Sequence, residues 1–386
     1  MRRRIYRPVL AVLLALALVW PLAACQICLP FPKDSVVDFL LAADAVVFAR
    51  EDPDEPFSLK ATEILVGDSA HTEIDLFLDS NTRRLLKVYP GRQVVCIYRK
   101  DGEEPGWRRI GVSDKDMEPL LRDVLEELPS WRAEPGRRPA YFAPHLGHEN
   151  RQLATLAHLE VARAPYADIK KVAGTLPRED IHAFLRDVRY LEWHALYILL
   201  LAQSGHPDDH ALIVERVRSA EELGSTLQLP AWATAWIEIG EEEALEFIEE
   251  KYFKDPDRTE EAGVVMTALS EHGSNGHVHL RDRIMKSYEV LLANHPSLVV
   301  RLLPDLTAWE RWELSPQISE IAAASLPEFD GAAQAQLRAY LRRAAAADGS
   351  GPAEPDGNSL LVIVLGLLLA VPIILGITSR FSREGA

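Results

Sequence analysis

The sequence predicts a multidomain chain with a small β-barrel domain, then an all-α domain, and one C-terminal transmembrane helix. Three patterns carry this prediction. Short strand-like segments separated by proline and glycine fill residues 45–112. Amphipathic helical segments with short connections follow from 139 to 345. The uncharged run 360–377 then has the length needed to cross a bilayer.

Residues 1–24 have the features of a secretory signal peptide. Four arginines lie within the first seven residues, and the apolar run 9–20 follows them, ahead of small residues. This run is shorter than the roughly 20 residues of a spanning helix. We therefore expect it to be removed, which makes Cys25 the first residue of the mature protein.

Cys25 has two interpretations that the sequence leaves open. The preceding residues, in LAAC at 22–25, resemble a bacterial lipobox, which implies that Cys25 is a candidate for lipidation. Ordinary cleavage would leave the cysteine unmodified. If Cys25 carries lipid, Cys28 and Cys96 remain as an even pair, which suits a disulfide in an oxidising compartment. Without lipid, either one thiol is left over or Cys25 pairs with Cys96.

The C-terminal end predicts a single membrane anchor. A flexible tether at 346–358 leads into the transmembrane helix at 359–379, and the tail 380–386 carries Arg380 and Arg383. Because basic residues stay on the cytoplasmic side, we expect a cytoplasmic C-terminus. The bulk of the chain is then extracytoplasmic, in the periplasm or at the cell surface, and the membrane is one predicted partner.

The charge of the chain excludes one class of partner. The formal net charge is −16, and it becomes −20 once the four arginines of residues 1–24 are removed. Nucleic-acid binders need a basic face, so we expect no nucleic-acid partner. The same acidity disfavours docking on anionic lipid headgroups.

Residues 25–130 are predicted to form the β-barrel domain. A short helix at 35–44 comes first, and a longer one begins near Asp114 and ends at Pro129. Strands this short and this evenly spaced favour a closed or partly closed barrel. The expected strands are residues 45–51, 57–65, 72–79, 92–100 and 107–112.

This first domain resembles the netrin-like domains, whose best-known members are the tissue inhibitors of metalloproteinases. The resemblance rests on the cysteine-rich start and on the segments AADAVVFARE, KATEILVG and PGRQVVCIYRK. It implies an oligonucleotide-binding (OB) fold barrel. It also implies that the amine and carbonyl of Cys25 chelate a protease's zinc. The family has Cys-x-Cys where this chain has Cys-x-x-Cys, and we expect a disulfide from Cys96 to Cys28 or Cys25 that ties the N-terminal segment to a barrel strand.

Residues 139–345 are predicted to be all α-helical. Gly205, Gly240 and Gly273 lie 35 and 33 residues apart, and each is expected to end a helix in the left-handed conformation. Such a period resembles that of HEAT-like α-solenoids, and a non-repeating helical bundle is the alternative. Helical spacing places the tryptophans of this region in the core; they are Trp193, Trp232, Trp236, Trp309 and Trp312.

No motif for catalysis or phosphate binding is present. The strongest metal-like pattern is HPDDH at 206–210, with His206, Asp209 and His210 as potential ligands. A proline in the first turn followed by two acids is also how a helix begins, and we favour that interpretation. The run HGSNGHVH at 272–279 supplies further histidines. We predict no catalytic, cofactor-binding or metal-binding residues, and no cofactor.

The sequence therefore favours a non-enzymatic extracytoplasmic scaffold that is anchored to the membrane and binds a protein partner. Helical solenoids present long surfaces for partners without needing catalytic groups. Two alternatives remain. One is an inhibitor-like or zinc-ligand module acting through Cys25. The other is a metal-dependent hydrolase built from His206, Asp209 and His210, or from the loop 272–279.

Overall fold

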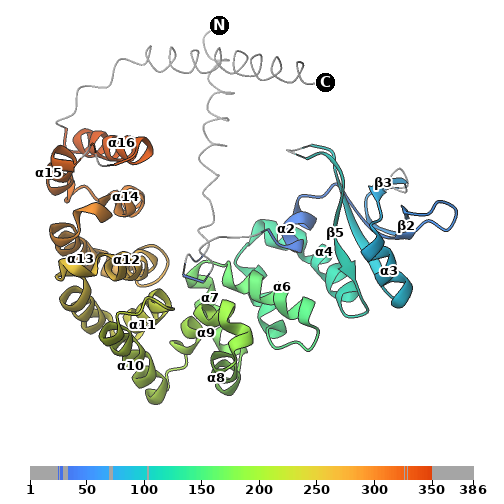
Figure 1. The fold of residues 1–386 in the computed structure, drawn as a ribbon, viewed down its shortest axis with the longest axis horizontal. Helices are drawn as coiled ribbons and strands as arrows, with labels where there is room; N and C mark the ends of the chain where they lie inside the picture. Colours follow the sequence, from blue (N-terminus) through green and yellow to red (C-terminus); the bar gives the residue numbers. More distant parts are fainter. Residues whose placement is uncertain are drawn as a thin grey trace, which may run out of the picture. The chain divides into compact units, whose positions relative to one another are not determined.

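A β region precedes a long run of helices, as the sequence predicts (Figure 1). This computed structural model describes residues 25, 27–28, 34–68, 73–101, 104–325, 327 and 329–349. The chain divides into two compact units, 1–295 and 296–386, so the predicted boundary between 130 and 139 lies inside the first unit.

The predicted membrane-targeting segments fall outside the described residues. They are the signal peptide 1–24, the transmembrane helix 359–379, the tail 380–386 and most of the tether 346–358. Within the part of the chain that is described, no helix combines the length and the apolar character needed to span a bilayer.

Five strands form one antiparallel sheet in the order β3-β2-β1-β4-β5 (Figure 1). Each overlaps the segment predicted for it, and the edge strands β3 and β5 also contact one another. The sheet therefore curls into a half-barrel. The strands are β1 (Ala45–Glu51), β2 (Ser58–Val66), β3 (Glu73–Phe77), β4 (Gln93–Arg99) and β5 (Gly106–Ser113).

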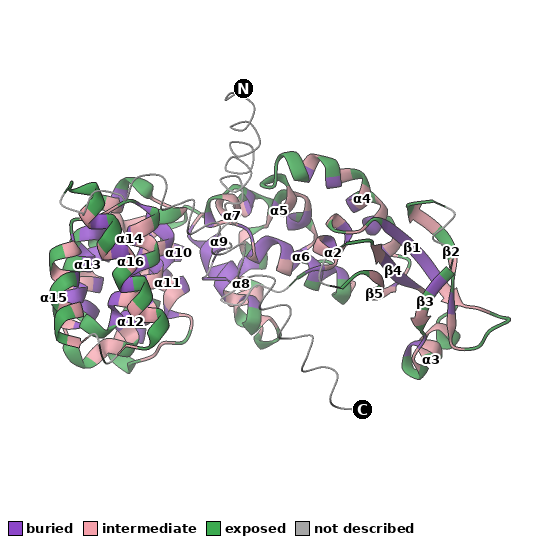
Figure 2. Ribbon diagram, turned by 90° about the horizontal axis from the view of Figure 1, so that it is seen from above, coloured by how far each residue is buried: buried purple, intermediate pink, exposed green. Residues whose placement is uncertain are grey.

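The central strands explain why the β-region sequence contains two unbroken apolar runs. Residues 45–49 of β1 and 94–97 of β4 are all buried, and β1 pairs with β2 on one side and β4 on the other (Figure 2). Strands covered on both faces lack the alternation of half-exposed strands. Cys96 belongs to this core and is completely buried.

A helix that the sequence analysis did not predict, α3 (Ser80–Val88), connects β3 to β4. Asp79 caps it by accepting hydrogen bonds from the backbone N–H groups of Asn81 and Thr82. The same carboxylate pairs with Arg109 of β5. The helix is short and largely polar, so apolar periodicity does not reveal it. The N-cap residue Asp79 is the sequence signal that could have predicted it.

The prediction that Pro129 ends a helix is wrong. Helix α4 (Met117–Ala133) runs through Pro129 for another turn. Trp131 in that turn is buried, and its ring packs against the rings of Tyr141 and Phe142. Burial of this aromatic cluster offsets the backbone hydrogen bond that proline removes.

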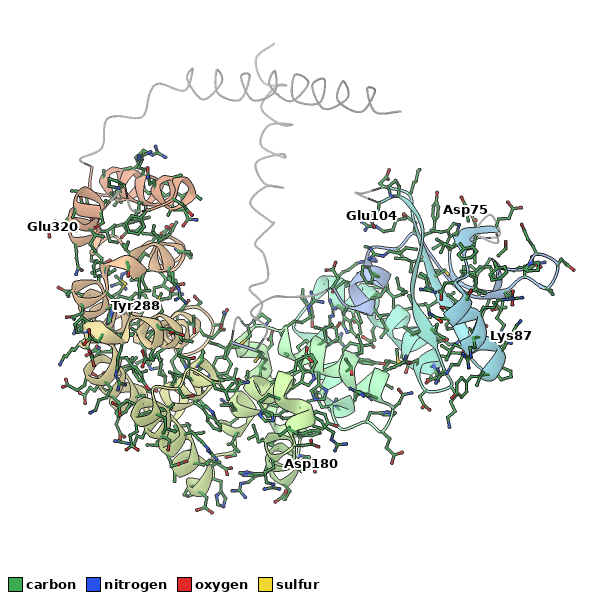
Figure 3. All side chains as sticks on the ribbon, in the orientation of Figure 1. Asp75, Lys87, Glu104, Asp180, Tyr288 and Glu320 are labelled. Atoms are coloured by element: carbon green, nitrogen blue, oxygen red, sulfur yellow. The ribbon has the colours of Figure 1, made fainter. Side chains whose placement is uncertain are left out.

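Among its described residues, the first unit also contains ten helices besides α3 and α4. They are α2 (Val36–Leu41), α5 (Arg137–Phe142), α6 (Arg151–Ala162), α7 (Tyr166–Val172), α8 (Arg178–Arg186), α9 (His194–Leu201), α10 (Pro207–Leu223), α11 (Leu229–Ile248), α12 (Thr259–Ser274) and α13 (Arg281–Asn294). Single turns lie between them: η2 (Ala143–His145), η3 (Ala173–Thr175), η4 (Val188–Trp193), η5 (Glu249–Phe253), η6 (Pro256–Arg258) and η7 (Val278–Leu280). Tyr288 of α13 is fully buried (Figure 3).

One charged network joins the sheet side of the first unit to its helices. Arg138 of α5 pairs with Asp38 of α2 at 3.0 Å and with Glu160 of α6, whose side chain is fully buried. Asp38 also pairs with Arg163. Since removing one member of a buried ion pair leaves the other uncompensated, this network fixes α2 against α5 and α6.

The second unit contains α14 (Val299–Ala308), α15 (Ser315–Ser325) and α16 (Gly331–Ala347), preceded by the turn η8 (Pro296–Leu298). Leu302, Leu306 and Leu337 are fully buried. The ring of Trp312 packs on Tyr340, whose hydroxyl donates to the carbonyl of Arg311.

Of the three periodic glycines, only Gly205 is left-handed, with φ +66°, and it lies three residues beyond Ala202, the C-cap of α9. Gly240 directly precedes a kink at Glu241 that divides α11 into two helical segments, and Gly273 is the second-last residue of α12. A helix therefore ends at or next to each of these two glycines, but without the predicted left-handed conformation. A Cβ at Gly240 would lie 3.0 Å from Nε1 of Trp236, so glycine there serves close packing.

Three of the five tryptophans lie in the core, as expected. Trp193, Trp236 and Trp309 are buried, whereas Trp232 and Trp312 are only partly covered. Trp232 contributes to an open groove described below.

Candidate functional site

Carboxylates and histidines converge where α11 meets the end of α12. We call Glu238, Glu241, His272, His277 and His279 the Glu238 cluster. One ligand atom from each of Glu238, His272 and His277 lies within 4.8 Å of the other two, and the same holds for Glu241, His277 and His279. Both glutamates lie on α11, and the histidines lie on α12 and the loop that follows it.

His272 is held as a neutral ring whose Nε2 is a donor and whose Nδ1 is an acceptor. The side chain is fully buried, and burial lowers its pKa from 6.5 to about 4. Its Nε2–H donates to the carbonyl of Thr234 at 2.9 Å, which leaves Nδ1 without a proton. The backbone N–H of His277 approaches Nδ1 at 3.3 Å.

His277 lies between two carboxylates. Its Nε2 is 3.1 Å from Oε2 of Glu238, and its Nδ1 is 3.3 Å from Oε1 of Glu241. Nε2 is buried, yet it has no well-aligned hydrogen-bond partner among the described residues. A ring nitrogen this close to a carboxylate oxygen shares a proton or a cation with it.

Glu238 is held from helix α7. Its Oε1 accepts a hydrogen bond from Lys170 at 2.8 Å, and its Oε2 accepts one from the hydroxyl of Tyr166 at 3.0 Å. Burial opposes ionisation of this carboxyl, but the hydrogen bond from Lys170 and the neighbouring histidine charges lower its pKa below the usual value. The group is therefore a carboxylate at neutral pH.

Two backbone features shape the cluster. Glu241 has φ +35° and ψ −101° at a kink that interrupts α11, and strained residues of this kind concentrate at functional sites. A Cβ at Gly276 would lie 2.6 Å from Nδ1 of His272. Only glycine lets the loop pass so close to that nitrogen.

Two of the three cysteines lie together next to this cluster. The sulfurs of Cys25 and Cys28 are 3.6 Å apart and buried, and both thiols act electrostatically on Tyr166. Burial, followed by the neighbouring Cys25, raises the pKa of Cys28 well above its usual value. The backbone N–H of Cys25 donates to the carbonyl of Ala164 at 3.3 Å.

Cys96 is not brought near them. It lies in the core of the sheet, where burial raises its pKa to about 12, and all three cysteines are free thiols. The predicted bridge from Cys96 to Cys28 or Cys25 is not formed in this structure. Lipidation of Cys25 stays a prediction, and it would require the fully buried sulfur to become exposed.

The HPDDH run has the role expected for a helix start. His206 is the N-cap of α10 and its Nδ1 accepts from the N–H of Asp208 at 3.2 Å. Asp209 is completely buried and accepts two hydrogen bonds from Arg178, at 2.6 and 2.7 Å, and one from His182 at 2.8 Å. We call Asp209, Arg178 and His182 the Asp209 cluster.

The other two ligand candidates of that run do not join Asp209. His206 is exposed, and His210 lines a different cleft with Trp236 and Glu243. Burial opposes the charge of Asp209, but hydrogen bonds, led by that from Arg178, lower its pKa to about 2. Its carboxylate is already saturated by donors.

A second candidate site is an open groove of about 380 Å³ between α8, α10 and the start of α11. We call it the leucine groove. Leu223 and Leu227 are 80% and 69% exposed there, although they are large apolar side chains. Its apolar lining includes Leu185, Leu191, Leu212, Leu223, Leu227 and Trp232.

The rim of the leucine groove is basic. Arg186, Arg216, His182 and His194 line it, and none of the described residues that line it is Asp or Glu. This is unusual in a chain with 58 acidic and 42 basic residues. The groove was not recognised from the sequence, because its residues come from four separate helices, α8 to α11, and the segments between them.

Comparisons with protein-family models, curated proteins and solved structures gave no match to this chain.

Proposed function

We propose that this protein is a non-enzymatic interaction scaffold, anchored to the membrane with its folded part outside the cytoplasm, and that the leucine groove binds a partner protein. The observation that carries the proposal is the exposure of Leu223 and Leu227 inside a groove with a basic rim. Exposed apolar surface framed by polar residues is typical of binding sites.

The chemistry of the groove defines the partner segment. Leu191, Leu223 and Trp232 offer apolar contacts to one face of an amphipathic helix. Arg186 and Arg216 offer charges to carboxylates beside that face. The partner is therefore an amphipathic segment that carries acidic residues.

The rest of the chain supports a scaffold more than the alternatives. A curled five-stranded sheet is compatible with the netrin-like OB barrel, and the successive helices with a HEAT-like array. Sequence features at 1–24 and 359–379 support export and anchoring. The inhibitor-like alternative needs Cys25 exposed, whereas its side chain is buried and its backbone N–H is bonded to Ala164.

Site-specific photo-crosslinking tests the groove. A benzoylphenylalanine replaces Leu223 in the full-length protein in its native membrane, and the same residue at Val88, which is 58% exposed on α3, is the control. We expect one discrete heterologous adduct from position 223 and none from position 88. R216E should abolish the adduct.

Three results would contradict this function. One is the absence of any adduct from position 223. Another is the same set of adducts from both positions, which indicates non-specific contact. The third is an adduct with a second copy of this chain, which makes the groove a self-association surface.

A further inference from the structure

We propose that Glu238, His272 and His277 form a zinc-binding site. Their ligand atoms come from α11, α12 and the following loop, and all lie within 4.8 Å of one another. Two histidines and one glutamate are a ligand set that zinc accepts in proteins, with a fourth position left for water. This site is independent of the proposed partner groove.

The strongest argument is that a further hydrogen bond or ion pair orients each proposed ligand side chain. Histidines that bind metals usually donate their other N–H to a carbonyl or a carboxylate, which fixes the tautomer and the ring orientation. His272 donates Nε2–H to Thr234, and Nδ1 of His277 lies 3.3 Å from Glu241. These contacts fix the orientation of both rings, and a metal at Nδ1 of His272 would displace the hydrogen bond from the backbone N–H of His277.

The carboxylate is oriented in the same way. Lys170 holds Oε1 of Glu238, so that Oε2 lies 3.1 Å from Nε2 of His277. Nε2 of His277 is buried and has no well-aligned hydrogen-bond partner among the described residues. Oε2 of Glu238 also accepts a hydrogen bond from Tyr166 at 3.0 Å, so helix α7 orients both oxygens of the carboxylate.

Charge and burial also suit a divalent ion. The two carboxylates of Glu238 and Glu241 outnumber the one ammonium of Lys170 beside them. The side chains of Glu238 and His277 are 9% and 17% exposed, and His272 is fully buried. Imidazole ligands favour zinc over calcium or magnesium, which prefer oxygen atoms.

The second ligand group, Glu241, His277 and His279, is the weaker one. His279 is 61% exposed, and within the cluster it contacts Glu241 at 3.3 Å and the ring of His277. His277 cannot give Nδ1 to a metal there and also keep it for Glu241. We therefore assign Glu241 to the outer contacts and His279 to the surface.

Zinc titration of the full-length, detergent-solubilised and chelator-treated protein tests the site by calorimetry. We expect one zinc per chain. H277N and E238Q should each weaken binding by about 100-fold or more, and E241Q by about 10-fold, which is the range for loss of an outer contact. H279A and H210A are matched controls and should leave the affinity unchanged.

Two further measurements guard against a folding defect. Circular dichroism of the metal-free variants should match the unsubstituted protein. Cobalt substitution of the unsubstituted protein should give the spectrum of a tetrahedral site with nitrogen and oxygen ligands. The proposal fails if stoichiometric zinc is absent, if H277N and E238Q bind as tightly as the unsubstituted protein, if H279A removes the metal, or if a thiolate-to-cobalt band appears.

Discussion

The Asp209 cluster and the Glu238 cluster use the same residue types for opposite purposes. At Asp209, Arg178 and His182 turn N–H donors toward a carboxylate and satisfy it. In the Glu238 cluster, His272 donates Nε2–H to a backbone carbonyl, that of Thr234, and His277 lies between two carboxylates. The two clusters therefore differ in what their histidines donate to: His182 donates to the Asp209 carboxylate, and His272 donates to a backbone carbonyl.

The largest expected difference between the two clusters is in how zinc changes the free energy of unfolding of their variants. At a free zinc concentration of about 100 times the dissociation constant, binding to the folded state adds about 2.7 kcal/mol to the free energy of unfolding. D209N should keep this increment, and H277N should lose it. Denaturant unfolding with and without zinc measures both. An increment lost in D209N would mean that the clusters are not separate.

Glycine replacements compare the loop after α12, at Gly276, with the loop before α10, at Gly205. G276A places a Cβ 2.6 Å from Nδ1 and 3.1 Å from Cα of buried His272. Overpacking of this kind costs about 1–3 kcal/mol. G205A meets no atom within 4 Å and should cost only about 1 kcal/mol, from its positive φ. The outcome that contradicts this is a G276A protein as stable as G205A that binds zinc normally.

Sequence patterns located the strands well because burial and turns are local signals. The run 45–51 gave β1 with its bounds unchanged. Pro129 was misjudged, since the buried ring of Trp131 lies in a helical turn beyond it. The contacts of that ring are not visible in the local sequence. The helix break at Gly240 was right, but the positive φ falls on Glu241.

Only part of the candidate site could be predicted from the sequence. The histidines of 272–279 form an obvious run. Glu238 is the one acid in the apolar first half of α11, residues 229–240, and lies 34 residues before His272. Lys170 lies farther still. Only the packing of α7 and α12 on α11 brings them together.

A disulfide between Cys25 and Cys28 would test whether these two cysteines lie together next to the Glu238 cluster. Their sulfurs, 3.6 Å apart, must approach to about 2.05 Å to bond. Oxidised glutathione should join Cys25 to Cys28 and leave Cys96 as a thiol, because Cys96 is enclosed by the sheet. A four-residue ring stabilises the folded state by about 2 kcal/mol in the chain-entropy model.

Non-reducing peptide mass mapping checks this bridge. A link from Cys96 to either other cysteine would instead support the pairing expected from the netrin-like resemblance. A diacylglyceryl mass on Cys25 in protein isolated from membranes would exclude the bridge altogether and would place the buried sulfur in a different conformation.

The smallest of the predicted effects is a loss of stability at low pH through the Asp209 cluster. The folded-state pKa of Asp209 is about 2, below the value of roughly 3.9 for an unfolded chain. A lowered pKa means that ionised Asp209 stabilises the fold above about pH 4, and that this contribution disappears as the pH falls toward 2. Because its partner Arg178 is partly exposed, solvent screening limits the loss to about 1–2 kcal/mol.

Unfolding free energies measured from pH 5 to pH 2 test this contribution. The difference between the unsubstituted protein and D209N should shrink across that interval, and D208N, at the exposed neighbouring position, should follow the unsubstituted curve. A difference independent of pH would mean that Asp209 stabilises α8 against α10 by shape rather than by charge. The Asp209 cluster would then no longer be the saturated ion pair that makes the Glu238 cluster distinctive.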